Sequence, residues 1–517
     1  MKELVYHRLL LPAVERNADR VGFLDGEYHG TFGGHLDRVT RLASGLGSLG
    51  VERSDRFAVM ALNGHEFLEC YHAAFLGAGV INPLNLRLAP KELEYILGDS
   101  ETKVCFTDRF FAPVVEKVRA AVGIEHVVLI GDGDAPHDVS YEALLASGSP
   151  QVPDEPEEDD PAILMYTGGT TGLPKGVLLD HRAEMLNLYH VMQMWQFGRD
   201  DVFLHQTPMF HAASMGGMLG VPAQGGVSVF LPLFDPARAL ELCEQHSVTQ
   251  TVMVPTMIGM LLGHPEFRAE RLAALQRLTY GASPMPAALL EHLLSMFPTL
   301  DVFQGYGMTE SSAVLTALGP DEHRAGGPRL RSAGRPLPGV VLSIQGASGE
   351  LLPQGETGEV CARAGNFMTE YWKKPDATAD AFRGGWYHSG DAGYVDPDGY
   401  LFLVDRVKDM IVTGGENVYS VEVENAIASH PAVEQVAVIG IPSDTWGEAV
   451  HAIVVVRPGA SVTEAEIIDH AREWIAGFKL PKSVEIRTEP LPLSGAMKVL
   501  KRELRDPYWA GRDRAVN

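Results

Sequence analysis

The segment Tyr166–Gly176 (YTGGTTGLPKG) gathers glycines, threonines and a lysine directly after a short apolar stretch. Glycines let backbone N–H groups approach an anion, and hydroxyl and ammonium groups add further donors. The pattern therefore predicts a polyphosphate-binding loop. Its spacing is not GxxxxGK[ST], because Pro174 precedes the lysine, which argues against a kinase or GTPase loop. The residues expected at the phosphates are Thr167, Gly168, Gly169, Thr170, Thr171, Gly172 and Lys175.

A second chemical cluster is the segment Gln304–Glu310 (QGYGMTE). An aromatic ring between two glycines can lie flat against a nucleobase, which is the role expected of Tyr306. The hydroxyl of Thr309 and the carboxylate of Glu310 follow at a spacing suited to an α-phosphate and a Mg²⁺ ion. Mg²⁺ prefers oxygen ligands and takes only one or two from protein when phosphates supply others.

Two further segments carry charged groups suited to a nucleotide. Tyr387–Asp391 (YHSGD) ends in a carboxylate that can accept hydrogen bonds from two ribose hydroxyls. Asp405–Asp409 (DRVKD) supplies Arg406, which can donate to ribose or phosphate oxygens. In isolation each would read as an exposed turn, so their interpretation depends on the other segments.

Taken in chain order, these segments resemble the signatures of the acyl-adenylate-forming superfamily, which includes acyl-CoA synthetases, peptide-synthetase adenylation domains and beetle luciferases. The family's phosphate loop usually reads [YF]TSGTTGxPKG, and Gly168 stands here where serine is common. The resemblance covers nearly the whole chain and is nearest to the fatty-acyl-CoA ligases. It implies an enzyme that activates a carboxylic acid with ATP and Mg²⁺ and passes the acyl group to coenzyme A.

The resemblance assigns roles to individual residues. It implies that Tyr306 stacks on adenine, Thr309 contacts phosphate, Glu310 binds Mg²⁺ and Asp391 binds ribose. Further nucleotide contacts are implied for Gly281, Ala282, Ser283, Gln304, Gly305, Gly307 and Arg406.

The second half-reaction is expected to need a moving domain. By resemblance, Lys498 bridges the attacking carboxylate and the α-phosphate, although Met497 stands where the family usually has glycine. Lys408 matches the hinge between a large unit, 1–405, and a small unit, 406–517. The stretch 413–417 resembles the edge of the pantetheine tunnel, through Gly414, Gly415 and Glu416, and an ordinary hairpin turn is the alternative.

The acid is expected to bind near Pro208–His211 (PMFH), which matches the family's PxFH segment. His211 would lie at the mouth of the acyl pocket and counts among the catalytic candidates. The small residues in 212–218 predict a roomy pocket for a fatty or bulky aryl acid, or else they only permit tight helix packing. The other pocket residues implied are Ala212, Ala213, Met215, Thr256, Met257, Gly281, Gly307 and Met308.

Three other functions compete with an acid:CoA ligase. A separate carrier protein could accept the acyl group, and a luciferase-like oxygenase would share the first half-reaction. A non-catalytic nucleotide-binding protein is the alternative of a different class. The joint presence of Lys175, Glu310, Asp391 and Lys498 argues against that last alternative.

The elements that must position these residues are predicted to alternate between strand and helix, which indicates an α/β fold with layered, largely parallel sheets. In such sheets ligands bind where loops leave the carboxyl ends of strands. The N-terminal unit is expected to be large and multi-lobed, and the C-terminal unit small and α+β. Predicted strands are 163–166, 202–204, 227–231, 251–254, 433–441 and 450–456; predicted helices are 181–195, 236–245, 286–296, 421–429 and 463–476. Thr463 and Glu466 form a predicted capping box.

Composition limits the partners. With 42 Lys+Arg and 67 Asp+Glu the net charge is −25, which opposes binding to nucleic acid or anionic membranes. The four cysteines form no CxxC pair, so buried thiols in a reducing cytoplasm are expected. No apolar run predicts a signal peptide or a membrane span. The acidic tract 153–160 is predicted to link two lobes, and a homodimer stays an open alternative.

Overall fold

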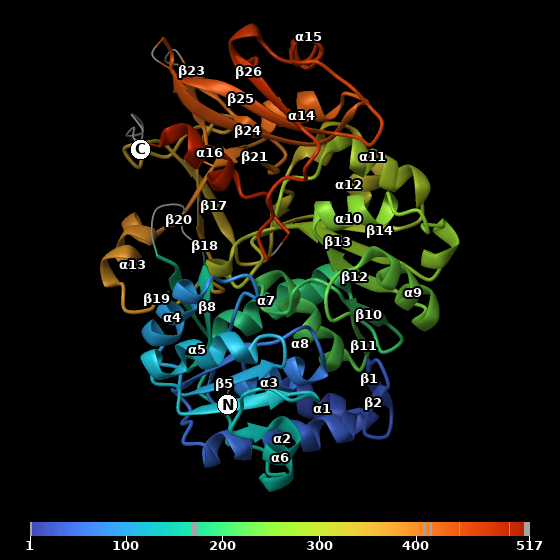
Figure 1. Ribbon diagram of the computed structural model, residues 1–517, viewed down its shortest axis with the longest axis vertical. Helices are drawn as coiled ribbons and strands as arrows, with labels where there is room; N and C mark the ends of the chain where they lie inside the picture. Colours follow the sequence, from blue (N-terminus) through green and yellow to red (C-terminus); the bar gives the residue numbers. More distant parts are fainter. Residues whose placement is uncertain are drawn as a thin grey trace.

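The computed structural model describes residues 3–167, 173–406, 409–413, 416–443, 445–495 and 497–510, without the side chains of Asp405, Arg406 and Asn417. Within these ranges the chain forms four β-sheets flanked by helices (Figure 1). The predicted α/β class is confirmed. The cores of the two largest sheets hold parallel strands, and the antiparallel strands lie toward their edges.

The nine-stranded sheet carries the segments predicted to bind adenine. Its five central pairings, from β1 to β14, are parallel, and β2, β15 and β16 join antiparallel at the two edges. In spatial order the strands are β16 (Arg335–Pro336), β15 (Thr316–Leu318), β14 (Asp301–Tyr306), β13 (Arg277–Gly281), β12 (Gln250–Met253), β10 (Val202–His205), β11 (Val227–Phe230), β1 (Val21–Asp25) and β2 (Tyr28–Thr31).

The eight-stranded sheet carries the predicted phosphate loop. That loop leaves the carboxyl end of β8, as expected for a ligand site in such a sheet. The strands in order are β19 (Glu370–Tyr371), β9 (Lys175–Asp180), β8 (Pro161–Thr167), β4 (Val80–Pro83), β3 (Arg56–Met60), β5 (Val104–Asp108), β6 (His126–Ile130) and β7 (Val139–Ser140).

Helices fill the space between the two large sheets. α3 contacts strands of both sheets, and α7 packs on α8. α3 and α8 are buried nearly all round, and the helices of this layer contribute to the largest apolar core. The helices concerned are α1 (His7–Asn17), α2 (Phe32–Ser48), α3 (His65–Phe75), α7 (His181–Trp195) and α8 (Met215–Gln224).

The outer faces are covered by shorter helices. α9, α10 and α12 contact the nine-stranded sheet, while α5 and α6 contact the eight-stranded one. The bounds are α4 (Pro90–Asp99), α5 (Ala112–Val122), α6 (Tyr141–Ser147), α9 (Pro236–His246), α10 (Pro255–Leu262), α11 (Ala287–Met296), α12 (Pro320–Ala325) and α13 (Pro375–Ala381).

A four-stranded antiparallel sheet, which the sequence patterns did not predict, carries the predicted ribose ligand. Its strands in order are β17 (Val341–Gln345), β18 (Gly358–Arg363), β20 (Tyr387–Val395) and β21 (Leu401–Arg406). Asp391 lies in β20 and pairs with Arg406 in β21.

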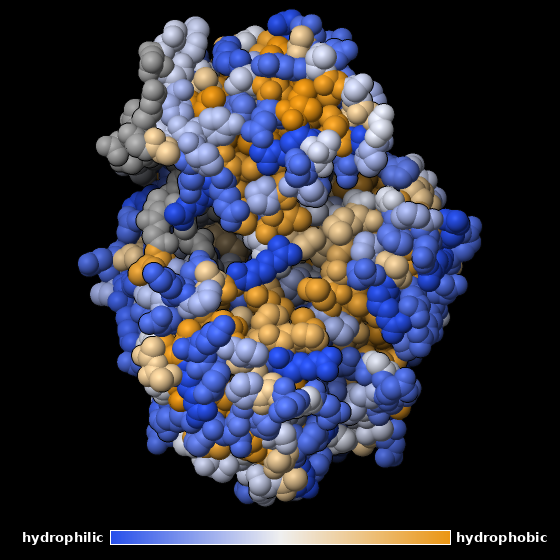
Figure 2. Space-filling model, in the orientation of Figure 1, coloured by the Kyte–Doolittle hydropathy of each residue, from blue (hydrophilic) through white to orange (hydrophobic). Residues whose placement is uncertain are grey.

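The last sheet, near the C-terminus, lies at the top of Figure 1. Its strands are β22 (Ile411–Thr413), β23 (Glu416–Val418), β24 (Val433–Ser443), β25 (Gly447–Val456) and β26 (Ser483–Arg487). α14 (Ser420–Ala428), α15 (Glu464–Arg472) and α16 (Lys501–Trp509) pack on it. Figure 2 shows a hollow where this part meets the body below it, with hydrophobic side chains around it.

Two interpretations of the sequence need correction. The acidic tract 153–160 does not link two lobes, because α6 before it and β8 after it belong to the same eight-stranded layer. Instead its carboxylates pair with Arg8, Arg53 and Arg182. The predicted helix 463–476 ends at Arg472, although its Thr463–Glu466 capping box is confirmed.

The four cysteines are buried and free, as predicted. Among the described residues, no helix has both the length and the apolar character needed to cross a membrane.

Candidate active site

The ends of the predicted phosphate loop face each other across an antiparallel ladder. β8 ends at Thr167 and β9 begins at Lys175, and these two residues pair directly. The hydroxyl of Thr167 donates to the carbonyl oxygen of Lys175 over 3.5 Å. The predicted donors at 168–172 lie outside the described residues, so the structure places only Thr167 and Lys175 of this group.

A tyrosine that the sequence reasoning missed joins two charged candidates. The hydroxyl of Tyr371 donates to Oε1 of Glu310 over 2.9 Å, and Nζ of Lys175 lies 4.7 Å from the centre of the Tyr371 ring. Burial, together with the Glu310 charge, raises the pKa of Tyr371, so its hydroxyl stays a donor. The lysine expected at the phosphates and the carboxylate expected at Mg²⁺ therefore contact the same side chain.

No local pattern could have identified Tyr371. It reaches this place because the two-residue strand β19 pairs with β9, where Tyr371 lies opposite Val177. Such a pairing joins segments far apart in the chain, and neither segment has a distinctive spacing that specifies the other.

The predicted adenine segments end adjacent parallel strands. Gly281 at the end of β13 pairs with Gly305 in β14. A Cβ atom on Gly281 would lie 2.4 Å from the carbonyl oxygen of Gly305, and one on Gly307 would lie 2.1 Å from that of Ala313. These two glycines are therefore required by close backbone contacts.

The rest of the adenine group lies around these strand ends. Ala282 has a φ of +65°, a conformation uncommon for a residue with a side chain. Gln304 Oε1 accepts a hydrogen bond of 3.2 Å from the Tyr280 hydroxyl. Ser283 is half-buried beside Ala282.

The predicted adenine and ribose ligands contact each other. The Tyr306 hydroxyl donates to Oδ2 of Asp391 over 2.7 Å, which joins the nine-stranded and four-stranded sheets. The backbone N–H of Asp391 donates to Oγ of Ser389 over 3.0 Å. Ser389 stands where the family has threonine, and its hydroxyl forms this turn. The side chain of Arg406 lies outside the described part of the chain.

A polar cluster next to Asp391 fixes the same turn. Oε1 of Glu359 accepts a hydrogen bond of 3.1 Å from the backbone N–H of Gly390. Oε2 of the same carboxylate lies 2.8 Å from Nδ1 of His388 and 2.8 Å from Nη2 of Arg383. The thiol of Cys361 lies 3.3 Å from the same His388 nitrogen. The cluster therefore positions the backbone that presents Asp391.

Thr309 and Glu310 lie in a 3-10 turn, Thr309–Ser311, directly after β14. The turn is held against a distant segment, because the backbone N–H of Met368 donates to the carbonyl oxygen of Glu310 over 2.7 Å. Glu310 is half-buried and offers a hard carboxylate ligand next to the Lys175–Tyr371 pair, which fits the chemistry that Mg²⁺ requires.

The charge of the C-terminal candidate Lys498 acts on His211. Burial, followed by the positive charge of Lys498, lowers the pKa of His211 to about 3. Nδ1 of His211 accepts from the backbone N–H of Ala213 over 3.2 Å, so a neutral imidazole carries its proton on Nε2. The arrangement brings an ammonium group to the segment predicted to receive the acid.

The acyl-pocket candidates divide between the core and the site. Ala212 and Met215 belong to the core between the sheets, and Met257 belongs to the core beneath α10. Met308 is half-buried and packs against two apolar clusters, to both of which α7 contributes side chains. Ala213 and Thr256 are half-buried near them.

The two readings of the small residues in 212–218 can now be compared. A Cβ atom on Gly216 would lie 2.6 Å from Val191, and one on Gly217 would lie 2.7 Å from the Phe203 ring. These glycines permit close packing of α8 on α7 and β10. They therefore supply no evidence for a roomy pocket.

The remaining candidates are only partly described. Gly414, Gly415 and Lys408 lie outside the described residues. Glu416 is exposed at the start of β23, which pairs with β22 through Thr413 and Glu416. The strands on either side of 414–415 therefore pair antiparallel, which is compatible with both alternatives for this stretch.

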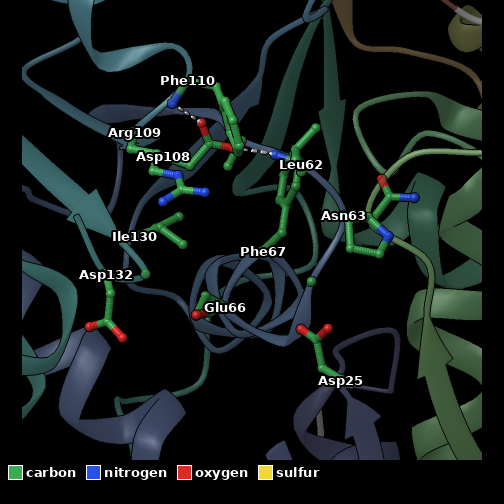
Figure 3. Close-up of a pocket in the computed structure, with 14 residues that line it drawn as sticks. Asp25, Leu62, Asn63, Glu66, Phe67, Asp108, Arg109, Phe110, Ile130 and Asp132 are labelled. Atoms are coloured by element: carbon green, nitrogen blue, oxygen red, sulfur yellow. Dashed lines mark hydrogen bonds between the residues drawn. The ribbon is translucent and has the colours of Figure 1, made fainter. Parts of the chain in front are cut away.

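A cavity of about 220 Å³ lies elsewhere, at the carboxyl ends of β3, β5 and β6 (Figure 3). Asp25, Glu66 and Asp132 line one side, and Arg109 points toward Ile130. Asp108 accepts from the backbone N–H groups of Leu62 and Phe110 over 2.9 and 2.8 Å. None of the predicted site residues that the structure describes lines this cavity.

Comparison with known proteins decides the family. A family model described as AMP-binding enzyme matches residues 11–372, and its companion, the AMP-binding enzyme C-terminal domain, matches residues 422–498. This chain belongs to the AMP-binding enzyme family. Together with its relatives, that membership makes it an AMP-forming acid–thiol ligase.

Relatives cover almost the whole chain. A feruloyl-CoA synthase from an Amycolatopsis species is 39% identical over 471 residues, 90% of this chain and 92% of the relative. A fatty acid–[acyl-carrier-protein] ligase, ScoC, from Streptomyces coeruleorubidus is 36% identical over 487 residues, 92% and 91% of the two chains. ATP-bound MatB from Rhodopseudomonas palustris is 30% identical with a TM-score of 0.88, covering 98% of this chain and 99% of that one.

Proposed function

We propose that this chain converts a fatty or bulky aryl carboxylic acid into its coenzyme A thioester through an acyl-adenylate, releasing AMP and pyrophosphate. The observation that carries the proposal is that the nucleotide candidates meet through Tyr371 and Tyr306, in a chain where the charge of Lys498 acts on His211. Attack of a carboxylate on the α-phosphate brings two anions together, so an ammonium group at that point stabilises the transition state.

In the first step a carboxylate oxygen attacks the α-phosphorus of ATP. An O–P bond to the acid forms, and the bond to pyrophosphate breaks. Lys498 bridges the two reacting anions, and Lys175 gives a second positive charge toward the leaving phosphates. His211, neutral because of its low pKa, offers an Nε2–H donor at the mouth of the acyl pocket without adding charge.

The nucleotide is held by groups whose positions are coupled. Tyr306 stacks on adenine while its hydroxyl orients the Asp391 carboxylate for the ribose hydroxyls. Thr309 and the donors of 167–172 contact phosphate oxygens. Glu310 would hold Mg²⁺, which neutralises phosphate charge when bound.

In the second step the thiol loses its proton to solvent as its sulfur attacks the acyl carbonyl carbon, the C–O bond to phosphate breaks, and AMP leaves. The loop that carries Lys498 must move away to admit the thiol. We infer that the unit 406–517 turns about Lys408 and that pantetheine passes Gly414, Gly415 and Glu416.

The relatives support two acid classes and two acceptors. The feruloyl-CoA synthase supports an aryl acid and coenzyme A. The carrier-protein ligase supports a fatty acid and makes a carrier-protein thiol the second candidate acceptor. The packed glycines of α8 favour neither acid.

Release of AMP over a panel of acids tests this proposal. Acetate, octanoate, palmitate and hydroxycinnamates are each supplied with Mg-ATP and either coenzyme A or a phosphopantetheinylated carrier protein. We expect coenzyme A-dependent release that is at least about tenfold faster with a long-chain or aryl acid than with acetate. Equal rates for acetate and octanoate contradict the acid class, and release only with the carrier contradicts the acceptor.

A further inference from the structure

The loop that carries Lys498 is a hairpin with its own internal bonds. Leu493 and Val499 form an antiparallel bridge, and the backbone N–H of Ser494 donates to the carbonyl oxygen of Lys498 over 2.7 Å. The backbone N–H of Lys498 in turn donates to Oγ of Ser494 over 3.1 Å. Lys498 is therefore presented by a closed turn, which moves as one piece.

The base of this hairpin is fixed to the C-terminal sheet. The backbone N–H of Leu491 donates to Oε1 of Gln435 in β24 over 3.0 Å. Lys501 forms a 2.7 Å ion pair with Glu424 and a 2.7 Å hydrogen bond with Ser420, both in α14. Whatever moves this sheet therefore moves Lys498.

The tip of the hairpin contacts the connection between β4 and α4 in the eight-stranded layer. Nη1 of Arg87 donates to the carbonyl oxygen of Leu493 over 2.7 Å. The side chain of Asn85 packs closely against Gly495, because a Cβ atom on Gly495 would lie 2.1 Å from Oδ1 of Asn85. That oxygen also accepts from the backbone N–H of Arg87 over 3.0 Å, so the two residues form one unit.

Met497 contacts a different lobe. It packs against the apolar cluster that contains Val254 and Met257, beneath α10. Its φ of +61° lies in the left-handed region, which costs free energy for any residue with a Cβ atom. The glycine usual in the family would avoid that cost but would make no such contact, so apolar packing offsets backbone strain at this position.

We infer that Asn85, Arg87 and Met497 form a latch that holds the Lys498 hairpin, and with it the C-terminal sheet, against the β4–α4 connection and the apolar cluster beneath α10. They are positioning residues for acid activation, and the inference rests on the proposed function. The latch is modest in strength, because Arg87 is joined to the hairpin by one exposed hydrogen bond. A latch of this strength suits a site that must open in every turnover, since both positions stay populated.

Replacement of Arg87 tests the latch through the two half-reactions. Arg87→Ala should slow acid-dependent pyrophosphate exchange by about three- to tenfold, the effect of one hydrogen bond. Thioester formation from supplied acyl-adenylate should not fall. Lys91→Ala, which removes a neighbouring exposed cation of α4, should change neither rate.

The outcomes separate the latch from the proposed function. An unmodified protein without pyrophosphate exchange would refute the proposed function. If the unmodified protein exchanges pyrophosphate normally and Arg87→Ala exchanges it as fast as Lys91→Ala does, the latch is overturned. An equal loss of both half-reactions in Arg87→Ala would also overturn it, because general damage rather than positioning would then explain the loss.

A reversible cross-link tests the same contact directly. Asn85→Cys combined with Gly495→Cys places two thiols at touching positions, and the four natural cysteines are buried. The oxidised protein should still form acyl-adenylate but lose thioester formation, and a reductant should restore it. Failure to cross-link contradicts the contact, and unchanged coenzyme A turnover in the oxidised protein contradicts the latch.

Discussion

At the scale of single residues, the proposed chemistry depends on one ammonium group. Lys498→Ala should reduce acid-dependent pyrophosphate exchange by at least about a hundredfold, because the transition state loses a charge partner. Thioester formation from supplied acyl-adenylate should change less than about threefold, since the bond to pyrophosphate is already broken. Both half-reactions are measured on the same preparation. An equal loss of both would refute the role of Lys498.

Residue types alone identified the candidates but not their neighbours. The spacing in 304–310 was enough to select Tyr306 and Glu310 as candidate ligands, because one segment contains the whole pattern. Tyr371 could not be predicted, since it meets Glu310 and Lys175 only through pairing of distant strands. Met497 was recognised as unusual from the sequence, but the packing that accompanies its backbone strain belongs to the folded chain.

At the scale of elements, the adenine site depends on the close pairing of β13 and β14. Gly281→Ala should push these strands apart, because its Cβ atom would lie 2.4 Å from the Gly305 carbonyl oxygen. Such overpacking costs about 1–3 kcal/mol and should weaken ATP binding by at least about tenfold. Thermal unfolding and ATP titration measure the two effects.

A matched glycine provides the control for this substitution. Gly259→Ala in α10 places its Cβ atom 3.8 Å from Leu289, an ordinary contact, and alanine favours a helix. Its ATP affinity should therefore equal that of the unmodified protein. Normal ATP binding by Gly281→Ala would show that the strand pairing does not shape the adenine site.

Local elements were predictable where the signal lay within one segment. The helix at 181–195 and the Thr463–Glu466 capping box match the structure because apolar spacing and caps are local properties. The four-stranded sheet was missed, since its strands mix buried with half-exposed positions and show no strict alternation. The acidic tract 153–160 was misread because its arginine partners come from three distant segments.

At the scale of the whole molecule, buried histidines set the response to acid. Burial lowers the pKa of His72 and His181 to about 4, and that of His205 to about 3, from an ordinary value of 6.5. Below pH 6.5 the unfolded chain binds protons that the folded chain does not. Each of these histidines therefore removes up to about 1.4 kcal/mol of stability per pH unit as the pH falls toward its folded pKa.

Thermal unfolding between pH 7 and pH 5 should consequently show a falling midpoint. His65 acts in the opposite sense, since its hydrogen bond to Asp25 raises its pKa against the effect of burial. Glu66, Asp180 and Glu184 also oppose the histidines, because burial raises the pKa of each carboxyl group, but the buried histidines with a lowered pKa outnumber these groups. His205→Gln, which cannot titrate, should show a weaker dependence on pH. A midpoint that is constant or rises from pH 7 to pH 5 would contradict this account.

The alternation of strands and helices was enough to predict the α/β fold class. It was not enough to predict how the sheets pack against one another. The meeting of the Lys498 hairpin with the connection between β4 and α4 joins the C-terminal sheet to the eight-stranded layer. Such a meeting depends on how whole layers pack, and no spacing within either segment specifies it.

The most direct test of the central claim is acid-dependent exchange of pyrophosphate into ATP, with Mg²⁺ and no coenzyme A. We predict that pyrophosphate exchange occurs when an aryl or fatty acid is present and is absent when no acid is added, because the carboxylate itself displaces pyrophosphate. A purified, folded protein that binds no ATP and exchanges no pyrophosphate across a broad panel of acids would contradict it.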